Sequence, residues 1–267
     1  MRRLAAALLL ALLAGCSALE FAYNNADTWL RWQAARYVEL EGAHAGEFEQ
    51  RLQAYLAWHR AEALPQYARL ASAAGARLQR GASREDLVWG YDALQDQVRE
   101  GLQRAAGQLG DFLDRLTPAQ VAQIERRFAK ENRKFAREWL EGTPEARRAR
   151  RHEWLAGALR DWLGELDDAQ MEHLRRYNES APLNGERRDL ERRRRQAELL
   201  AMLRARDSAR RLGEWAHDWQ GAPARGTDAF LDMLAGLERS LSPRQRAHAA
   251  ARLRGYARDF TVLAAAR

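Results

Sequence analysis

Side chains that branch at the β-carbon are nearly missing from this sequence of 267 residues, which holds five Val, five Thr and a single Ile. β-Strands draw heavily on these residues, so a fold built on sheets is close to excluded. Ala, Leu, Arg, Glu and Gln, which are good helix formers, dominate instead. With 46% hydrophobic residues and nine Trp, the chain has enough apolar material for a core. We therefore predict an all-α fold.

The first sixteen residues have the form of a bacterial lipoprotein signal. Two Arg residues precede an apolar run over residues 4–14, which is too short to span a bilayer. The run ends in Leu13-Ala14-Gly15-Cys16, which resembles a lipobox, the site where a bacterial lipoprotein is acylated and cleaved. We predict that residues 1–15 are removed and that Cys16 carries the lipid. An ordinary secretory signal is the alternative.

Lipidation would use the single cysteine of the chain, leaving no thiol for a disulfide, a nucleophile or a metal site. Ser17 rather than Asp follows Cys16, and by resemblance to sorted lipoproteins this favours the outer membrane. We therefore expect the protein on the periplasmic side of the outer membrane, held there by its lipid anchor. The formal net charge of +7 is a modest excess, and we predict no nucleic-acid partner.

The helical periodicity beyond the signal predicts a single helical domain over residues 27–267, with residues 16–26 as a lipidated cysteine and short tether. Short loops favour antiparallel neighbours. We expect an antiparallel bundle of about seven to nine helices, either compact or elongated.

Three element boundaries can be predicted from cap and breaker residues. The first helix is expected from Asp27 to about Glu41. The next is expected to kink or restart at Pro65, because proline lacks the N–H that a helix interior needs. An Arg-rich helix is expected to run without interruption from Asn184 to about Gln220.

A five-residue pattern of Leu, a small polar residue, two variable residues and Gln occurs three times. The copies are Leu116 to Gln120, Leu166 to Gln170 and Leu241 to Gln245. In each copy the polar residue (Thr117, Asp167 or Ser242) can accept from the N–H of the third helical residue, and the Gln can reach back to the cap N–H. Helix capping therefore explains the whole pattern. Because Glu also serves in a capping box, we expect exchange of the three Gln for Glu to leave thermal melting near normal.

The first copy, Leu116-Thr117-Pro118-Ala119-Gln120, also resembles the Leu-Thr-x-x-Gln motif of the periplasmic Spy/CpxP-type proteins. These are small helical stress proteins, and Spy is a chaperone. The resemblance implies a chaperone-like or stress-related role, in which the Gln residues would form part of a client surface.

A second resemblance covers most of the chain. Tyr23-Asn24-Asn25, the pair Trp29 and Trp32, Tyr37-Val38-x-Leu40, Asn132-Arg133-Lys134 and Gly142-Thr143-Pro144-Glu145 are similar to segments of a family of uncharacterised all-helical lipoproteins of Gram-negative bacteria. The chain departs from that pattern at Glu41-Gly42-Ala43-His44. The family has no assigned activity, so this resemblance implies a location and a fold but no mechanism.

Two Glu-x-x-His pairs, Glu41 with His44 and Glu214 with His217, are the best candidates for a metal site. Two such pairs with two further Glu residues build the di-iron site of ferritin-like bundles, so a metal-dependent enzyme is one alternative. Such pairs arise readily by chance in a Glu-rich chain, and no nucleophile, metalloprotease or nucleotide motif is present. We predict a protein that is not an enzyme, with no catalytic residue, no metal and no cofactor.

A run of arginines suggests a second alternative, a binder of anionic lipid or lipopolysaccharide, because guanidinium groups bind phosphates well. The run comprises Arg187, Arg188, Arg192, Arg193, Arg194 and Arg195. We favour the interpretation of a solvated helix face, in which Asp189 pairs with Arg193 and Glu191 with Arg195.

Tryptophan is unusually frequent in this chain. The helical spacing of Trp154 with Trp162, and of Trp215 with Trp219, predicts core positions. Trp29 and Trp32 either pack on the bundle or lie at the membrane interface near the anchor. We expect the protein to act through contacts with unidentified envelope proteins or surfaces, and its oligomeric state stays open.

Overall fold

The computed structural model describes residues 18–218 and 226–266, and within them it contains helices and no strand, which confirms the all-α prediction. Their number exceeds the expected seven to nine. The α-helices are α2 (Ala18–Asn24), α3 (Ala26–Ala35), α4 (Gly42–Trp58), α5 (Leu64–Gln79), α6 (Arg84–Leu113), α7 (Pro118–Phe135), α8 (Pro144–Leu163), α9 (Asp168–Ser180), α10 (Gly185–Ala205), α11 (Ser208–His217), α12 (Thr227–Arg239) and α13 (Pro243–Ala265). Two short π-helices, η1 (His59–Ala63) and η2 (Ala136–Leu140), extend α4 and α7.

The N-terminal region differs from the expected tether and first helix. Residues 18–24 of the expected tether form α2, which packs on α13. The following helix, α3, ends at Ala35 instead of near Glu41. The Tyr37 ring lies edge-on to the Phe128 ring, with the ring centroids 5.9 Å apart. The chain therefore leaves the helix so that the segment after Ala35 can pack on α7.

Pro65 restarts a helix, as predicted. It is the second residue of α5, the helix that directly follows η1. Proline cannot donate to the preceding turn of an α-helix, and a π-turn is one of the local distortions that accommodate such a break. Residues 42–79 therefore form one distorted rod.

The prediction of an uninterrupted helix from Asn184 to Gln220 is wrong. α10 ends at Ala205, and Arg206 adopts a left-handed conformation with φ 53° before α11 begins at Ser208. The cause is Asp114, the residue that follows the C-terminal end of α6. The Asp114 carboxylate accepts hydrogen bonds from the backbone N–H groups of Ser208 (2.6 Å) and Ala209 (3.0 Å), and so caps α11 from another helix.

A glycine allows α11 to lie against α6 in this way. A β-carbon placed on Gly110 would lie 2.8 Å from the Ala209 Cα, which is closer than real β-carbons approach. The turn at Arg206 is therefore decided by tertiary packing.

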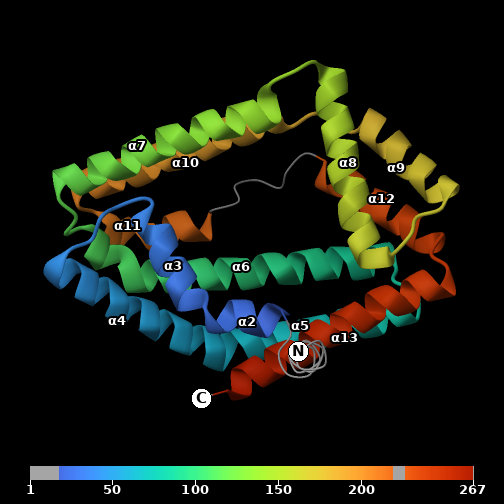
Figure 1. The fold of residues 1–267 in the computed structure, drawn as a ribbon, viewed down its shortest axis with the longest axis horizontal. Helices are drawn as coiled ribbons and strands as arrows, with labels where there is room; N and C mark the ends of the chain where they lie inside the picture. The colour runs from blue at the N-terminus through green and yellow to red at the C-terminus, as the bar shows by residue number, and fades with distance from the viewer. Residues whose placement is uncertain (1–17, 219–225, 267) are drawn as a thin grey trace, which may run out of the picture.

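The helices pair in antiparallel fashion and enclose an elongated frame (Figure 1). α7 and α10 form one long edge, α5, α6 and α13 lie on the opposite one, and α8, α9 and α12 close one end. The antiparallel order of α5 and α13 is fixed by hydrogen bonds at both ends of the pair, from Arg60 to the Leu263 carbonyl (2.9 Å) and from Arg246 to the Leu78 carbonyl (3.2 Å).

The buried residues form several small clusters instead of one central core. One cluster joins α6, α7 and α10 through Phe112, Ile124 and Leu203. Another joins α8, α9 and α12 through Leu155, Leu174 and Met233. Of the helices in the described ranges, none is long and apolar enough to cross a membrane.

Candidate ligand-binding groove

The three copies of the repeat begin helices α7, α9 and α13. In each copy the side chain of the cap residue accepts from the N–H of the Gln three positions later, and the Gln side chain accepts from the N–H of the cap residue. The structure thus contains the three capping boxes that the spacing predicts.

Two of the copies also bind each other. The Gln170 side-chain amide donates to Oε1 of Gln245 (3.0 Å), and the Gln245 amide donates to Oε1 of Gln170 (2.8 Å). Gln170 also donates to the Ser240 carbonyl, and Gln245 to the Glu165 carbonyl, each of which precedes the Leu of the other copy. Both glutamines are buried. They join the starts of α9 and α13, and their amides offer no exposed surface to a client protein.

The Gln of the first copy also donates to the carbonyl that precedes a Leu, here in a segment outside the three predicted copies. The Gln120 amide donates to the Glu39 carbonyl (2.9 Å), which precedes Leu40. The segment Leu40-Glu41-Gly42-Ala43-His44 begins α4 with Glu41 in the cap position, although no side chain caps this helix. It is a degenerate fourth copy. The available signal was Phe48, which follows Leu40 by the same eight residues that separate Leu116 from Ile124.

The two Glu-x-x-His pairs do not come together as ligands. Glu41 precedes α4, and the His44 ring packs edge-on against Phe112. His217 contacts the side chain of Gln103 through Nδ1 (3.0 Å). Within residues 18–218 and 226–266, no group of three or more His, Cys, Asp or Glu residues could hold a metal ion. Cys16 lies outside the described residues.

Most of the arginine run on α10 is neutralised within its own helix. Asp189 binds Arg193 (2.7 Å) and Glu191 binds Arg195 (3.2 Å), as expected. Arg192 is also paired with Asp189, and Arg194 with Glu191. Ion pairs of this kind on a helix surface add little to stability.

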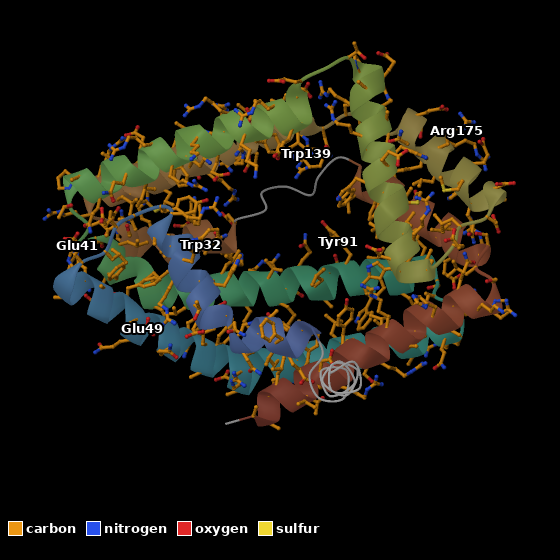
Figure 2. All side chains as sticks on the ribbon, in the orientation of Figure 1. Trp32, Glu41, Glu49, Tyr91, Trp139 and Arg175 are labelled. Atoms are coloured by element: carbon orange, nitrogen blue, oxygen red, sulfur yellow. The ribbon has the colours of Figure 1, made fainter. Side chains whose placement is uncertain are left out.

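Arg187 and Arg188 are the exceptions in this run. Both are exposed, and neither has a carboxylate partner in the described part of the chain. The Arg188 guanidinium lies 5.5 Å from the centre of the Trp139 ring. Figure 2 shows Trp139 at the end of the α7 edge, where this edge approaches α8.

The prediction that Trp154 and Trp162 are core residues is wrong. Trp154 is 62% exposed. Trp162 is 38% exposed, although the Tyr256 ring and the Arg252 guanidinium of α13 lie against it. Trp215 is half-buried, and Trp219 lies outside the described residues. Trp29 and Trp32 on α3 are exposed as well.

Trp154 and Trp162 border an apolar cavity of about 360 Å³, which we call the Trp groove. Its walls are formed mainly by α8 and α12, with single residues from α5, α6 and α13. They include Leu78, Leu87, Leu159, Phe230, Leu234 and Leu237. Among the described residues that line the groove, Glu238 is the single ionisable one. The volume falls in the range of about 300–1,000 Å³ that small-molecule sites occupy.

A second cavity of about 330 Å³ adjoins the Trp groove, and Trp154, Leu155 and Phe230 line both. Four arginines and two further aromatic rings line this second cavity, which we call the basic pocket. They are Arg147, Arg150, Arg151, Arg188, Trp139 and Tyr177. The acidic lining residue is Glu138, which pairs with Lys134 (3.7 Å).

The arginines of the basic pocket differ in how they are held. Arg147 is paired with Glu186 (2.6 Å). Arg151 donates to the carbonyls of Asn178 (2.5 Å) and Ala181 (3.0 Å), where it satisfies the C-terminal end of α9. Burial lowers the pKa of Arg151 from its ordinary value, and the nearby positive charge of Arg148 lowers it further, while Tyr177 opposes the shift. The guanidinium stays charged nevertheless, because arginine starts from so high a pKa.

The chain matches a known protein family over most of its length. The model of a family of unknown function, DUF6279, matches residues 36–221. The chain belongs to this family. The DUF6279 match includes α4 to α11, and therefore α8 with its exposed tryptophans and the arginines of the basic pocket, whereas Tyr23-Asn24-Asn25 and Trp29 lie outside it. It agrees with the resemblance to an uncharacterised family. No curated protein and no solved structure matches the chain.

Proposed function

We propose that this DUF6279 protein is a non-catalytic binding protein of the bacterial envelope, which takes up an apolar ligand in the Trp groove. The observation that carries the proposal is the position of Trp154, which is 62% exposed at the border of an almost entirely apolar cavity. Exposed apolar surface that lines a concave site is typical of ligand binding.

The chemistry of the groove supports binding over catalysis. Its single ionisable lining residue, Glu238, forms an ion pair with Arg246 and accepts a hydrogen bond from the backbone N–H of Ala82 (3.0 Å). The carboxylate is therefore occupied in joining α12 to α13 and to the loop before α6. No acid or base in the lining is placed to act on a ligand.

Nile red, a neutral dye that fluoresces in apolar surroundings, tests the groove. We expect the protein to bind the dye, and Trp154→Ala to weaken binding about tenfold, since about 1.4 kcal/mol of apolar contact is removed. Trp29→Ala is the matched control, because Trp29 is 55% exposed on α3 and lines neither cavity. Dye binding that both variants weaken equally, or that is absent from the wild type, would exclude the groove.

The location at the outer membrane, on its periplasmic side, is part of the proposal. The lipobox-like sequence ending at Cys16 supports it, as do the exposed rings of Phe21, Trp29 and Trp32 in the two helices that follow. Aromatic side chains are favoured at a membrane interface. We expect Cys16→Ser to abolish incorporation of labelled palmitate and to leave either an uncleaved form or a soluble periplasmic form. Retention of Cys16→Ser in the outer membrane would contradict lipidation at this residue.

A chaperone-like role is the second candidate, because unfolded proteins also expose apolar segments that fit an open groove. It predicts that the wild type suppresses aggregation of an unfolded model protein and that Trp154→Ala does not. If the wild type binds Nile red but fails to suppress aggregation at several-fold excess, the ligand is not a protein segment.

A further inference from the structure

The Trp groove and the basic pocket are two parts of one surface with opposite chemistry. Trp154, Leu155 and Phe230 line both, so an elongated ligand can extend from one into the other without leaving the surface. We propose that together they form a site for a single-chain amphiphile with a phosphate head group. Its acyl chain would lie between α8 and α12, and its phosphate among Arg150, Arg151 and Arg188. This inference rests on the proposed function, because it assigns a ligand class to the same groove.

Charge is the first argument for an anionic head group. Arg150, Arg151 and Arg188 have no carboxylate partner in the parts of the chain that the structure describes. Arg150 donates to the Glu141 carbonyl (2.6 Å), Arg151 donates to carbonyls at the end of α9, and Arg188 lies over aromatic rings. Three positive charges thus line one cavity, where Glu138 is the acidic residue among the described lining residues.

Two guanidinium forks, those of Arg150 and Arg188, favour phosphate over carboxylate, and Arg151 adds positive charge. The Arg151 guanidinium already donates to Asn178, Ala181 and Pro182. A phosphate carries more negative charge and more acceptor oxygens than a carboxylate, and the planar guanidinium fork donates to two such oxygens at once. A carboxylate has two oxygens and would satisfy one fork.

The walls of the Trp groove favour an acyl chain over a peptide. An extended peptide brings backbone N–H and C=O groups that must be hydrogen-bonded when buried. The groove side chains are apolar apart from Glu238, and the backbone groups of α8 and α12 are bonded within their own helices. An acyl chain has no polar groups, so it gives up no hydrogen bonds to water when it is buried in the groove.

Three ligands with shared parts separate the contributions of tail and head. They are myristoyl lysophosphatidic acid, monomyristoylglycerol, which has the same tail without the phosphate, and glycerol phosphate, which has the head without the tail. We would titrate each, below its micellar concentration, into residues 16–267 carrying Cys16→Ser, so that neither detergent nor the apolar signal segment competes for the groove. We expect the lysophosphatidic acid to bind roughly ten- to a hundredfold more tightly than the monoacylglycerol, the range that a single charged hydrogen bond gives.

The double variant Arg150→Gln/Arg188→Gln tests the head-group site, because both side chains are exposed and their loss spares the hydrogen bonds of Arg151. We expect this variant to lose the preference for lysophosphatidic acid while its affinity for monomyristoylglycerol is unchanged. Arg133→Gln/Arg187→Gln is the matched control, since it removes the same charge from exposed positions on α7 and α10 outside the pocket. Thermal melts should show both double variants as stable as the wild type.

The outcomes distinguish this inference from the proposed function. Equal affinity for the two lipids, or an equal loss in both double variants, overturns the phosphate site but leaves the groove as a binding site. Binding of an acidic apolar peptide in preference to either lipid overturns the acyl-chain assignment. If neither lipid nor Nile red binds, the proposed function fails as well.

Discussion

Gln170 and Gln245 donate to each other through their side-chain amides, at 3.0 and 2.8 Å, while each also caps its own helix. The side-chain oxygen of each glutamine accepts from the cap N–H of its own helix and from the amide of the other glutamine. The side-chain nitrogen donates to the other glutamine and to the backbone carbonyl that precedes the Leu of the other copy. A carboxylate can accept these hydrogen bonds, but it cannot make the donated ones, because it has no hydrogen to donate.

The first prediction follows from this pair. Gln170→Glu should lower the free energy of unfolding by about 1–3 kcal/mol, since it removes buried donors and sets a carboxylate against the Ser240 carbonyl. Gln120→Glu should cost less, because Gln120 is only half-buried and donates to a single carbonyl. Denaturant unfolding of the two variants measures the difference. Equal losses would show that the buried amide pair adds nothing to capping, and only losses near zero in both variants would agree with the expectation of near-normal melting.

The second prediction concerns the cap that α6 provides for α11. Asp114→Ala should cost about 0.5–2 kcal/mol of stability, the usual value of a helix cap, because the Ser208 and Ala209 N–H groups lose their acceptor. Asp92→Ala on the same helix is the control, since Asp92 is exposed. Urea unfolding monitored by circular dichroism gives both values. A loss no larger than that of the control would mean that Asp114 does not hold α11.

The third prediction concerns pH. His59 lies in η1 among aromatic rings, where Tyr23 Oη lies 2.9 Å from its Nδ1, and burial lowers the pKa of His59 from its ordinary 6.5. Burial also raises the pKa of the Tyr23 phenol to about 12, so this group keeps its proton at neutral pH. The unfolded chain therefore takes up a proton at His59 before the folded protein does.

Acidification should therefore destabilise the folded protein through His59. The contribution of His59 to stability is complete above pH 6.5 and is lost as the pH falls from 6.5 towards the lower pKa of the folded state, by up to about 1.4 kcal/mol per pH unit. His59→Asn, which keeps an acceptor near Nδ1 but does not titrate, should flatten this dependence. Unfolding free energies measured between neutral and mildly acidic pH test it. Parallel curves for the two proteins would contradict a lowered pKa at His59.

The fourth prediction concerns metal content. We expect purified protein to contain no stoichiometric iron, manganese or zinc, because His44 and His217 pack against Phe112 and Gln103 instead of meeting as ligands. Elemental analysis before and after dialysis against a chelator measures this. A stoichiometric metal that His217→Ala removes would favour the alternative of a metal-dependent enzyme.

Local physics explains the features that the sequence determined by itself. The scarcity of β-branched residues leaves helices as the available structure, and the three capping boxes follow from residues within one helical turn of each other. The pairs Asp189 with Arg193 and Glu191 with Arg195 follow from the same short range. Such interactions join residues three or four positions apart, so the spacing alone predicts them.

The tertiary structure alone decided the features that depend on distant partners. Asp114 and Gly110 hold α11 against the end of α6 and so fix the break at Arg206, which the helical periodicity did not predict. The hydrogen bond from Gln120 to the Glu39 carbonyl identifies residues 40–44 as a fourth copy of the repeat. Periodicity indicates that Trp154 lies on an apolar face, but whether another helix covers that face depends on the whole arrangement. The basic pocket likewise unites Arg150 with Arg188 from separate helices, because helix packing brings together side chains that the sequence keeps apart.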